Sequence, residues 1–284
     1  MKILVTGATG FIGKAVCTAL KEISYHVIEI NSKNGNILND ETWNSLPYCE
    51  VLIHLAAQTF VPHSWANPAS FVEINSFGTL KALEYCRKHN SKMIYVSSYL
   101  YGNSISFPIN ESAELFTPNP YALSKKIAEE YCSFYANNFS LKCVILRPFN
   151  IYGPGQSPIF LIPEIINQIV KNKHIKVKDL EPKRDYIYID DFISAVISSI
   201  YLDKFEIINI GAGKSYSVGN IINEIQNILG TNYAVLSNNE KRQGEIMDTI
   251  ADISKAKKIL NWEPKINLHE GLSKIIKNMY NEYR

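Results

Sequence analysis

A tyrosine–lysine pair in the middle of the chain could transfer protons. Tyr121 and Lys125 lie four residues apart in a segment of helical pattern, which places both on one face of the helix. A free tyrosine has a pKa of about 10. A neighbouring ammonium stabilises the phenolate and lowers that pKa, which suits acid–base chemistry near neutral pH. A surface pair without function is the alternative, because this spacing is common.

A glycine-rich turn near the N-terminus could hold a dinucleotide beside this pair. Gly7-x-x-Gly10-x-x-Gly13 follows a predicted strand at 3–5 and opens a predicted helix at 11–21. In such a turn the first glycine allows the tight bend, the second lets the backbone approach a pyrophosphate, and the third allows helix and strand to pack closely. The free N–H groups of the helix start then bind the anion. We expect Phe11 and Ile12 to line the same site, and an ordinary strand–helix turn is the alternative.

The end of the second predicted strand, 27–30, bears on the choice of cofactor. An acid at this position binds the ribose 2′-hydroxyl of NAD. Here Asn31-Ser32-Lys33 follows the strand, so that an amide replaces the acid and Lys33 could meet a 2′-phosphate. The segment favours NADP(H) over NAD(H), with a solvated loop lysine as the alternative. Asn36 and Ile37 are expected near the adenine.

Two serines end the predicted strand at 92–97. A hydroxyl at this carboxyl edge could hydrogen-bond a reacting carbonyl oxygen and hold it beside Tyr121, and either Ser97 or Ser98 could supply it. The alternative is a serine that satisfies backbone groups. Asn119 and Pro120 suit the cap and first position of the helix that carries the pair. Together these residues predict hydride chemistry on an alcohol or ketone.

Composition excludes several other classes of function. The 284 residues carry 29 Lys+Arg and 27 Asp+Glu, a formal net charge of +2 that gives no electrostatic footprint for nucleic acid. The five cysteines are scattered, which predicts reduced thiols of a cytosolic protein and no metal site. We find no signal peptide and no apolar run near the roughly 18 residues that span a bilayer.

Strand-like and helix-like runs alternate in the first half of the chain. Strands at 3–5, 27–30, 51–55, 92–97 and 142–146 and helices at 11–21, 71–88 and 120–137 predict an α/β fold with a doubly wound parallel sheet. We divide the chain into a dinucleotide-binding domain, 1–150, and a smaller α/β substrate lobe, 151–284. Helices are expected there at 163–171, 218–229 and 269–280. A strand at 206–210 is a candidate to return to the first sheet.

With these residues in hand, the chain resembles the extended short-chain dehydrogenase/reductase family, in its branch of nucleotide-sugar epimerases, dehydratases and 4-keto reductases. The likeness covers nearly the whole chain. It is carried by the glycine turn, the Tyr121/Lys125 pair, and the segments His54-Leu55-Ala56-Ala57, Asn75-Ser76-Phe77-Gly78-Thr79, Val96-Ser97-Ser98-Tyr99-Leu100-Tyr101-Gly102, Leu146-Arg147-Pro148-Phe149-Asn150-Ile151-Tyr152-Gly153-Pro154-Gly155-Gln156, Arg184-Asp185-Tyr186-Ile187-Tyr188-Ile189-Asp190-Asp191, Asn209-Ile210-Gly211 and Arg242-Gln243-Gly244-Glu245.

The resemblance implies a Rossmann-type fold and a role for each matched residue. The residues implied to line the cofactor are Leu55, Ala56, Ala57 and Asn75, with Pro148 and Phe149 at the nicotinamide. Asn150 would bind a nucleotide-diphosphate sugar, and Arg184 and Arg242 would clamp its pyrophosphate, a task that suits a guanidinium fork. For each arginine an ordinary surface ion pair is the alternative. A homodimer through the helices near 71–88 and 120–137, and a part in surface-polysaccharide precursor synthesis, are also implied.

Two departures from the family pattern narrow the reaction. Sugar 4,6-dehydratases carry an Asp-Glu pair after the catalytic hydroxyl residue, where this chain has Tyr99-Leu100, so no dehydratase activity is expected. The segment from Ser97 to Tyr101 is one residue shorter than in many epimerases and resembles GDP-fucose synthase-type reductases. Counting back from Tyr101 favours Ser97 as the catalytic hydroxyl, and counting along the strand favours Ser98.

The leading hypothesis is a reductase of a nucleotide-activated 4-keto hexose, such as a 6-deoxyhexose, with Tyr121 as the acid. The second is a UDP-hexose 4-epimerase, which uses the same residues but keeps NAD bound and returns the hydride to the other face of the sugar. A protein that only senses dinucleotides is a third possibility. Such proteins often lose the tyrosine–lysine pair, which this chain keeps.

Overall fold

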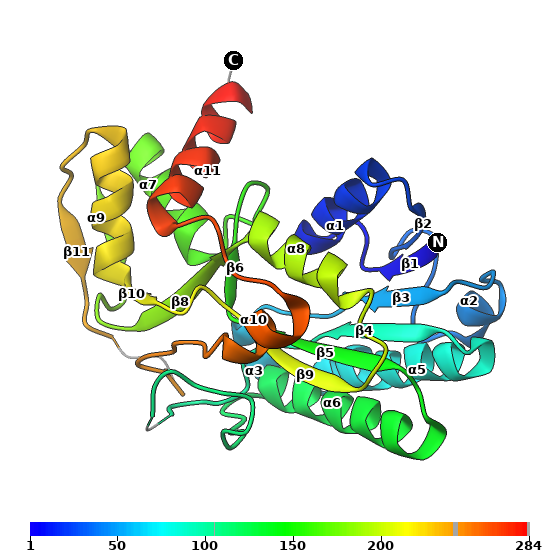
Figure 1. Cartoon of the computed structure of the whole chain (residues 1–284). Helices are drawn as coiled ribbons and strands as arrows, with labels where there is room; N and C mark the ends of the chain where they lie inside the picture. Colours follow the sequence, from blue (N-terminus) through cyan, green and yellow to red (C-terminus); the bar gives the residue numbers. More distant parts are fainter. Residues whose placement is uncertain (105, 241–243, 283–284) are drawn as a thin grey trace.

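The fold is an α/β sandwich with a smaller lobe at one end of its main sheet (Figure 1). The computed structural model describes residues 1–104, 106–240 and 244–282. Six strands form the main sheet in the order β2-β1-β3-β4-β5-β9, and every pairing in it is parallel. These strands are β1 (Lys2–Thr6), β2 (His26–Ile30), β3 (Val51–His54), β4 (Lys92–Val96), β5 (Cys143–Pro148) and β9 (Glu206–Ile210). Since all run the same way, the segments that follow them meet at one edge.

Helices cover both faces of this sheet, so the predicted doubly wound fold is confirmed. Helices α1 (Phe11–Glu22) and α8 (Ile189–Ser199) lie on one face, where Ile3, Val5, Val16 and Phe192 share a buried cluster. Helices α5 (Gly78–His89) and α6 (Pro120–Phe139) lie on the other face. Strand β9 pairs with β5, so the strand at 206–210 belongs to the main sheet. The division into 1–150 and 151–284 stays a prediction.

The single helix predicted at 71–88 is interrupted. It consists of α4 (Pro68–Phe71), one π-helical turn (Val72–Phe77) and α5. The π-helical turn contains Asn75 and Ser76, whose side chains are buried and hydrogen-bonded to α6. Single π-helical turns inside α-helices occur frequently at functional sites, and this one brings polar groups of two neighbouring helices into contact.

The C-terminal lobe contains small sheets that the sequence pattern did not reveal, whereas the helices predicted at 163–171, 218–229 and 269–280 are confirmed as α7, α9 and α11. A three-stranded sheet has the order β10-β8-β6, and a two-stranded sheet pairs β11 with β7. The remaining elements are β6 (Asn150–Tyr152), β7 (Ile175–Val177), β8 (Lys183–Tyr188), β10 (Ser215–Ser217), β11 (Val235–Ser237), α2 (Asp40–Asn44), α3 (Val61–Ala66), α7 (Leu161–Asn172), α9 (Val218–Leu229), α10 (Ser254–Leu260) and α11 (Leu268–Glu282). Strands of three residues are too short to show a period.

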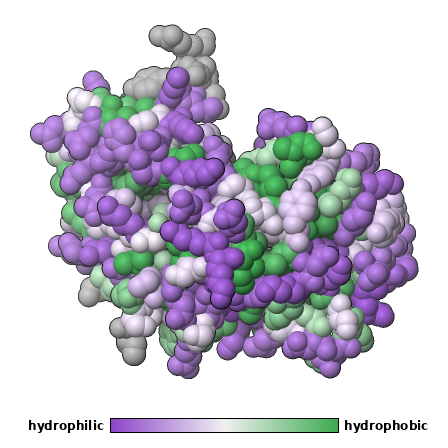
Figure 2. Space-filling model, viewed as in Figure 1, coloured by the Kyte–Doolittle hydropathy of each residue, from purple (hydrophilic) through white to green (hydrophobic). Residues whose placement is uncertain are grey.

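The surface seen in Figure 2 is mainly hydrophilic, with apolar side chains visible in the hollow between the lobe and the main sheet. Among the described residues no helix has the length and apolar character needed to cross a membrane.

Candidate active site

The glycine turn after β1 has the close packing that the sequence predicted. A Cβ atom at Gly13 would lie 2.1 Å from the carbonyl oxygen of Gly7, and one at Gly7 would lie 2.8 Å from the Ala56 nitrogen. Gly7 also has a φ of +70°, which side chains other than glycine rarely adopt. Helix α1 and the loop after β3 therefore approach the turn closely because these two positions carry no side chain.

The start of α1 offers N–H groups to an anion. Gly10 caps the helix, no side chain bonds to the cap, and the first turn contains no acidic residue. Phe11 and Ile12, predicted to line the cofactor, form this first turn and are partly exposed. Uncapped N–H groups at the positive end of a helix dipole suit a pyrophosphate. The turn therefore fits the dinucleotide that the sequence predicted.

The segment after β2 forms a polar loop without an acid. Asn31 Oδ1 accepts a hydrogen bond from the Lys33 amide at 2.9 Å, and Ser32 and Lys33 are exposed. Glu29, the nearest acid, is ion-paired with Lys21 at 2.5 Å, with the Lys21 side chain 56% exposed. Asn36 lies at the surface, but Ile37 is 9% exposed and its carbonyl accepts a hydrogen bond from the Trp43 indole N–H. The loop therefore presents neutral and basic groups where NAD-specific sites carry an acid.

Asn75 organises the loop that follows β3. Its amide oxygen accepts from the Gln58 backbone at 2.8 Å, and its amide nitrogen donates to the Gln58 carbonyl at 3.0 Å and to Ser124 Oγ at 2.9 Å. Asn75 is buried, so the structure places it as a support for the loop rather than at an open surface. The loop begins with Leu55, Ala56 and Ala57, the residues predicted beside the cofactor.

Thr6 holds the start of the same loop. Its hydroxyl accepts from the amides of Leu55 and Ala56, both at 3.2 Å, and lies 2.8 Å from His54 Nδ1. Burial, with the charge of Lys125, lowers the pKa of His54 to about 3, so the imidazole is neutral. Because the hydroxyl oxygen already accepts two N–H bonds, its proton is directed to Nδ1. The backbone on the cofactor side is thus locked by buried polar contacts.

Tyr121 and Ser98 come together at the carboxyl edge of the sheet. Helix α6 begins as predicted, with Asn119 accepting from the Ala122 amide at 2.8 Å and Pro120 in the first turn. Burial raises the pKa of Tyr121 to about 12, and a hydrogen bond with the Ser98 side chain partly opposes that rise. Ser97 is buried and its Oγ has no hydrogen-bond partner within the described residues. Of the two serines, Ser98 is the one in contact with Tyr121.

Lys125 lies beneath this pair, in a position that differs from the expectation. Its Nζ donates to the Val96 carbonyl at 2.6 Å and lies 4.6 Å from the centre of the Tyr95 ring. Burial lowers the pKa of Lys125 to about 7, although the Glu129 carboxylate acts to raise it. The expected lowering of the Tyr121 pKa is therefore wrong, because desolvation of the phenol is the largest cause and raises that pKa.

A buried polar network lies one helical turn beyond Lys125. Arg147 Nη2 lies 2.6 Å from Glu129 Oε2, and both side chains are 4% exposed. The guanidinium also donates to the Tyr101 hydroxyl at 2.9 Å, which donates to Asn209 Oδ1 at 2.6 Å. This network joins α6 to β5 and β9, with Glu129 close enough to Lys125 to act on its pKa. Sequence reasoning missed Glu129, although its i+4 spacing from Lys125 was a signal.

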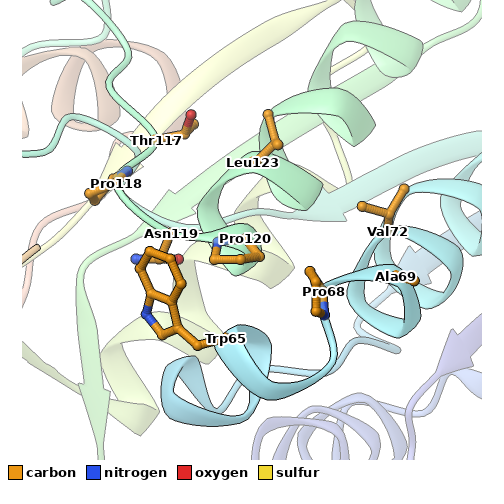
Figure 3. A pocket seen from close by; sticks show the side chains of 9 residues that line it. All are labelled: Trp65, Pro68, Ala69, Val72, Thr117, Pro118, Asn119, Pro120 and Leu123. Carbon is orange, nitrogen blue, oxygen red and sulfur yellow. The ribbon is translucent and has the colours of Figure 1, made fainter. Parts of the chain in front are cut away.

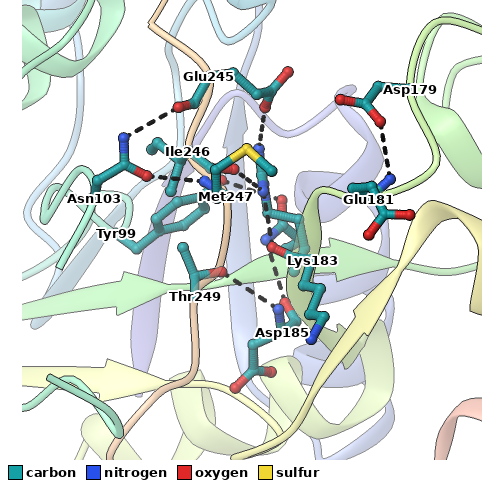
Figure 4. Close-up of polar contacts among 12 residues, drawn as sticks. Tyr99, Asn103, Asp179, Glu181, Lys183, Asp185, Glu245, Ile246, Met247 and Thr249 are labelled. Atoms are coloured by element: carbon teal, nitrogen blue, oxygen red, sulfur yellow. Dashed lines mark hydrogen bonds and ion pairs between the residues drawn. The ribbon is translucent and has the colours of Figure 1, made fainter. Parts of the chain in front are cut away.

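On the side where a substrate was predicted, polar side chains bond to backbone groups and to one another (Figure 4). Asn150 Nδ2 donates to the Asp185 carbonyl at 3.2 Å. Arg184, predicted to clamp a pyrophosphate, is half-buried and pairs with Glu245 at 2.5 Å. It also donates to the carbonyl of Ile246. A carboxylate therefore sits where an anionic substrate group would meet this guanidinium, and Arg242 lies outside the described residues.

Asn103 holds the chain segment that carries Glu245. Its amide nitrogen donates to the Glu245 carbonyl at 3.1 Å, and its oxygen accepts from the Met247 amide at 2.8 Å (Figure 4). The Met247 carbonyl accepts from the Lys183 amide at 2.8 Å. Segment 245–247 is thus anchored between the loop after β4 and strand β8. Nothing local in the sequence around Asn103 predicts this role.

A shallow apolar groove of about 380 Å³ lies beside the start of α6. It is lined by Trp65, Pro68, Ala69, Val72, Thr117, Pro118, Asn119, Pro120 and Leu123 (Figure 3). Neither the glycine turn nor the Tyr121–Ser98 pair lines it, so it is separate from the candidate active site. Among the described residues, no group of three or more His, Cys, Asp and Glu side chains is placed to hold a metal.

The glycine turn, the tyrosine–lysine pair and the sheet that positions them define an enzyme of the extended short-chain dehydrogenase/reductase type. Residues 3–211 match the model of the NAD dependent epimerase/dehydratase family. The chain therefore belongs to this family of NAD(P)-dependent nucleotide-sugar epimerases and reductases.

The individual relatives include both epimerases and reductases. The chain is 33% identical over 306 residues to a putative UDP-glucose 4-epimerase of Methanocaldococcus jannaschii, covering 99% of each chain. It is 26% identical over 301 residues to the GDP-6-deoxy-D-mannose reductase of Pseudomonas aeruginosa, covering 100% of this chain and 98% of that one. The crystal structure of a UDP-glucose 4-epimerase from Thermotoga maritima with UDP-glucose superposes with a TM-score of 0.95 at 30% identity, covering 100% of both chains.

Proposed function

We propose that the chain is a reductase of a nucleotide-activated 4-keto hexose. The observation that carries the proposal is the state of Tyr121, whose pKa burial raises to about 12. A neutral phenol at the carboxyl edge of the sheet is an acid, and a carbonyl oxygen requires a proton when hydride reaches its carbon. Reduction therefore starts from the neutral phenol, the form that burial of Tyr121 favours.

Each residue of the reacting group has a distinct part in this proposal. The nicotinamide, held by this chain, would supply the hydride for C4 of the sugar. Tyr121 transfers its hydroxyl proton to O4, while Ser98 donates a hydrogen bond to the same oxygen and orients it. Lys125, with a pKa lowered to about 7 by burial, is close to half-protonated at neutral pH and stabilises the phenolate that remains. Ser97 supports the strand end beneath them.

The cofactor is proposed to lie along the glycine turn with its pyrophosphate at the start of α1. Pro148 ends β5 and Phe149 follows it, and the Pro148 carbonyl accepts a hydrogen bond from the amide of Tyr99, the residue after Ser98, which suits the nicotinamide end. At the adenosine end, Asn31 and exposed Lys33 favour NADP(H), because no carboxylate there would repel a 2′-phosphate. NAD(H) remains compatible with the neutral asparagine.

The substrate is proposed to be a nucleotide-diphosphate sugar held by Asn150, Arg184 and Arg242. Arg184 has two of its nitrogens engaged by Glu245 and Ile246, a fork geometry that also fits phosphate oxygens. A diphosphate must then displace Glu245 from the guanidinium. The nucleotide-sugar ligands and names of the relatives support this substrate class.

The second candidate is 4-epimerisation of a UDP-hexose. The observation that favours it is the similarity to proteins named as UDP-glucose 4-epimerases, at 33% identity for one relative and a TM-score of 0.95 for one structure. The same side chains would serve it, with Tyr121 acting as base in the first half and acid in the second. An epimerase returns the hydride to the same sugar, so it keeps its cofactor.

Cofactor retention separates the two candidates. The purified protein is denatured and the supernatant assayed for nicotinamide nucleotides, and NADPH oxidation is followed with 4-keto nucleotide sugars. The proposal expects substoichiometric nucleotide and ketone-dependent NADPH oxidation. Stoichiometric NAD⁺ with interconversion of UDP-hexoses would replace the reductase by the epimerase.

Replacement of Tyr121 by phenylalanine tests the acid in either reaction. Tyr121→Phe removes the only proton that this residue can transfer, and we expect kcat to fall by about 10²–10⁴-fold. Thermal unfolding and cofactor affinity should stay close to wild type, because the ring is retained. The control Tyr48→Phe, at an exposed tyrosine, should keep full activity. Full turnover by Tyr121→Phe would refute the assigned acid.

A homodimer is proposed through the face formed by the π-helical turn, α5 and α6. This face exposes the large apolar side chains Val72, Phe77, Leu123, Phe134 and Phe139. Contiguous exposed apolar residues mark interaction surfaces. Light scattering should give twice the monomer mass, and Phe134→Glu should shift it towards the monomer, whereas the control Leu236→Glu, at an exposed residue of β11, should not. A monomeric wild type would overturn the dimer.

The cytosol is the proposed location. All five cysteines are buried and unpaired. Unpaired thiols are typical of reducing compartments.

A further inference from the structure

Tyr99 is the partly exposed member of a group of stacked aromatic rings at the substrate side. Its ring stacks on Phe149 with centroids 5.2 Å apart and an interplanar angle of 19°, and Phe149 also stacks on Tyr101. Phe149 and Tyr101 are buried, whereas Tyr99 reaches the partly exposed side. The Tyr99 amide donates to the Pro148 carbonyl at 3.2 Å, which holds the residue against β5. Tyr99 therefore presents a rigid ring to the site.

The hydroxyl of Tyr99 lies among the groups proposed to bind the diphosphate. It is 3.4 Å from Asn150 Oδ1, to which it donates. The pKa of Arg184 is raised, although burial acts to lower it. The largest cause that raises it is the nearby Tyr99 phenol. The phenol and the guanidinium are thus close neighbours, and Figure 4 shows Tyr99 next to the Glu245–Met247 segment.

The same side chain also lies near the reacting group. Burial and the proximity of Tyr99 both raise the pKa of Tyr121. Tyr99 directly follows Ser98 and its hydroxyl reaches Asn150, so its side chain lies between the proposed reacting group and the groups proposed to bind the diphosphate. A hexose joined to a diphosphate would lie along this side chain.

We propose that Tyr99 determines how the hexose is oriented: its ring supports the sugar, and its hydroxyl, with Asn150 and Arg184, positions the diphosphate. The stereochemical part of this inference rests on the proposed function, because it concerns the face of C4 that receives the hydride. An aromatic ring gives large contact area at little cost in side-chain entropy, and correct orientation strongly accelerates a reaction. A sugar held between this ring and the reacting group presents one face.

Truncation at this position should therefore loosen the sugar without removing the acid. Tyr99→Ala opens the volume of a phenol beside the hexose, so both faces of C4 become accessible to hydride. Tyr99→Phe keeps the ring and removes only the hydroxyl near Asn150. Ring and hydroxyl can thus be tested separately, and both changes keep Tyr121, Ser98 and Lys125 in the chain.

The binding test uses calorimetry with UDP against UDP-glucose and GDP against GDP-mannose, on whichever pair binds the wild type. The ratio of the two dissociation constants measures what the hexose adds. Tyr99→Ala should reduce this hexose increment about tenfold. Tyr99→Phe should weaken diphosphate and sugar nucleotide alike, by about 2- to 10-fold, and leave the increment unchanged. The control Tyr48→Ala, at an exposed residue before β3, should change neither value.

The stereochemical test analyses the products of 4-keto nucleotide-sugar reduction by NMR. The wild type should give one C4 epimer, Tyr99→Phe the same one, and Tyr99→Ala both. An unchanged hexose increment and a single epimer in Tyr99→Ala would overturn the inference. A lost increment in a protein that reduces no 4-keto sugar would keep the sugar-binding role of Tyr99 while refuting the reductase. Binding of neither nucleotide pair by the wild type would overturn both.

Discussion

The cofactor side and the substrate side of the site are held in place by different means. The glycine turn and the loop after β3 are fixed by backbone packing and by buried partners such as Thr6 and Asn75. The substrate side depends on an ion pair between Arg184 and Glu245, which are 61 residues apart in the chain. The first side is held by contacts within the protein. In the proposed function, the second side exchanges a protein carboxylate for a substrate phosphate, so its contacts change on binding.

This difference also explains what the sequence could predict. The turn at Gly7 to Gly13 and the helix start at Asn119 depend on residues within a few positions of one another, so local rules identify them. The sequence placed Lys125 on the face of Tyr121 but could not show that its amine bonds Val96 at the end of β4. The sign of the Tyr121 pKa shift depends on that arrangement and on burial.

The substrate side could be predicted only as a set of residue types. Arg184 and Asn150 were identified from a resemblance, whereas the pairing of Arg184 with Glu245 is a long-range contact. The same holds for the bonds from Asn103 to Glu245 and Met247, across 142 and 144 residues. The short strands of the lobe are set by tertiary contacts rather than by a periodic pattern.

The largest expected effect is on the pH dependence of stability, and it comes from the buried amine of Lys125, which bonds the end of β4 next to the cofactor side. Unfolded lysine has a pKa of about 10.4, whereas the folded pKa of Lys125 is lowered to about 7. Between these values the unfolded chain binds more protons, so the free energy of unfolding rises with pH, by at most about 1.4 kcal/mol per unit. Lys125→Met should lose this rise between about pH 7 and about pH 9, measured by urea unfolding.

Lys126 provides the matched control for that experiment. It is the next residue on α6 and is partly exposed, so Lys126→Met should keep the pH dependence of the wild type. Equal slopes in Lys125→Met and the wild type would show that the ammonium is not desolvated. The cofactor side would then be less rigidly packed than the comparison requires.

A smaller effect is expected from a methyl group in the glycine turn. Gly13→Ala places a Cβ 2.1 Å from the Gly7 carbonyl oxygen, which forces α1 away from β1. Overpacking of about 1–3 kcal/mol would weaken cofactor binding by about 5- to 150-fold, as measured by calorimetry with NADPH and NADH. Nucleoside diphosphate binding should not change, since Asn150 and Arg184 form their hydrogen bonds with residues outside the turn.

Gly219 is the control for an added methyl group, because a Cβ there would meet no atom closer than 3.6 Å. Gly219→Ala should leave both affinities unchanged. A Gly13→Ala variant that lost cofactor and nucleotide binding equally, with an unchanged melting temperature, would show that the two sides are coupled through the turn. The cofactor side and the substrate side could then no longer be treated as independently held.

The smallest effect is expected on the substrate side, at Arg184. A lysine keeps the charge but cannot offer a planar fork to Glu245, the Ile246 carbonyl or a diphosphate. Arg184→Lys should raise KM for the nucleotide sugar about tenfold and change kcat little. The variant loses one charge-assisted hydrogen bond of about 1.5–3 kcal/mol to the diphosphate. It also loses one to Glu245, so the two losses partly cancel in the free energy of binding. Cofactor affinity should stay constant. The control Lys183→Arg, at the exposed neighbour, should match the wild type. A lower kcat at unchanged KM would mean that Arg184 acts on the reaction rather than on binding, because an interaction made only in the transition state changes kcat.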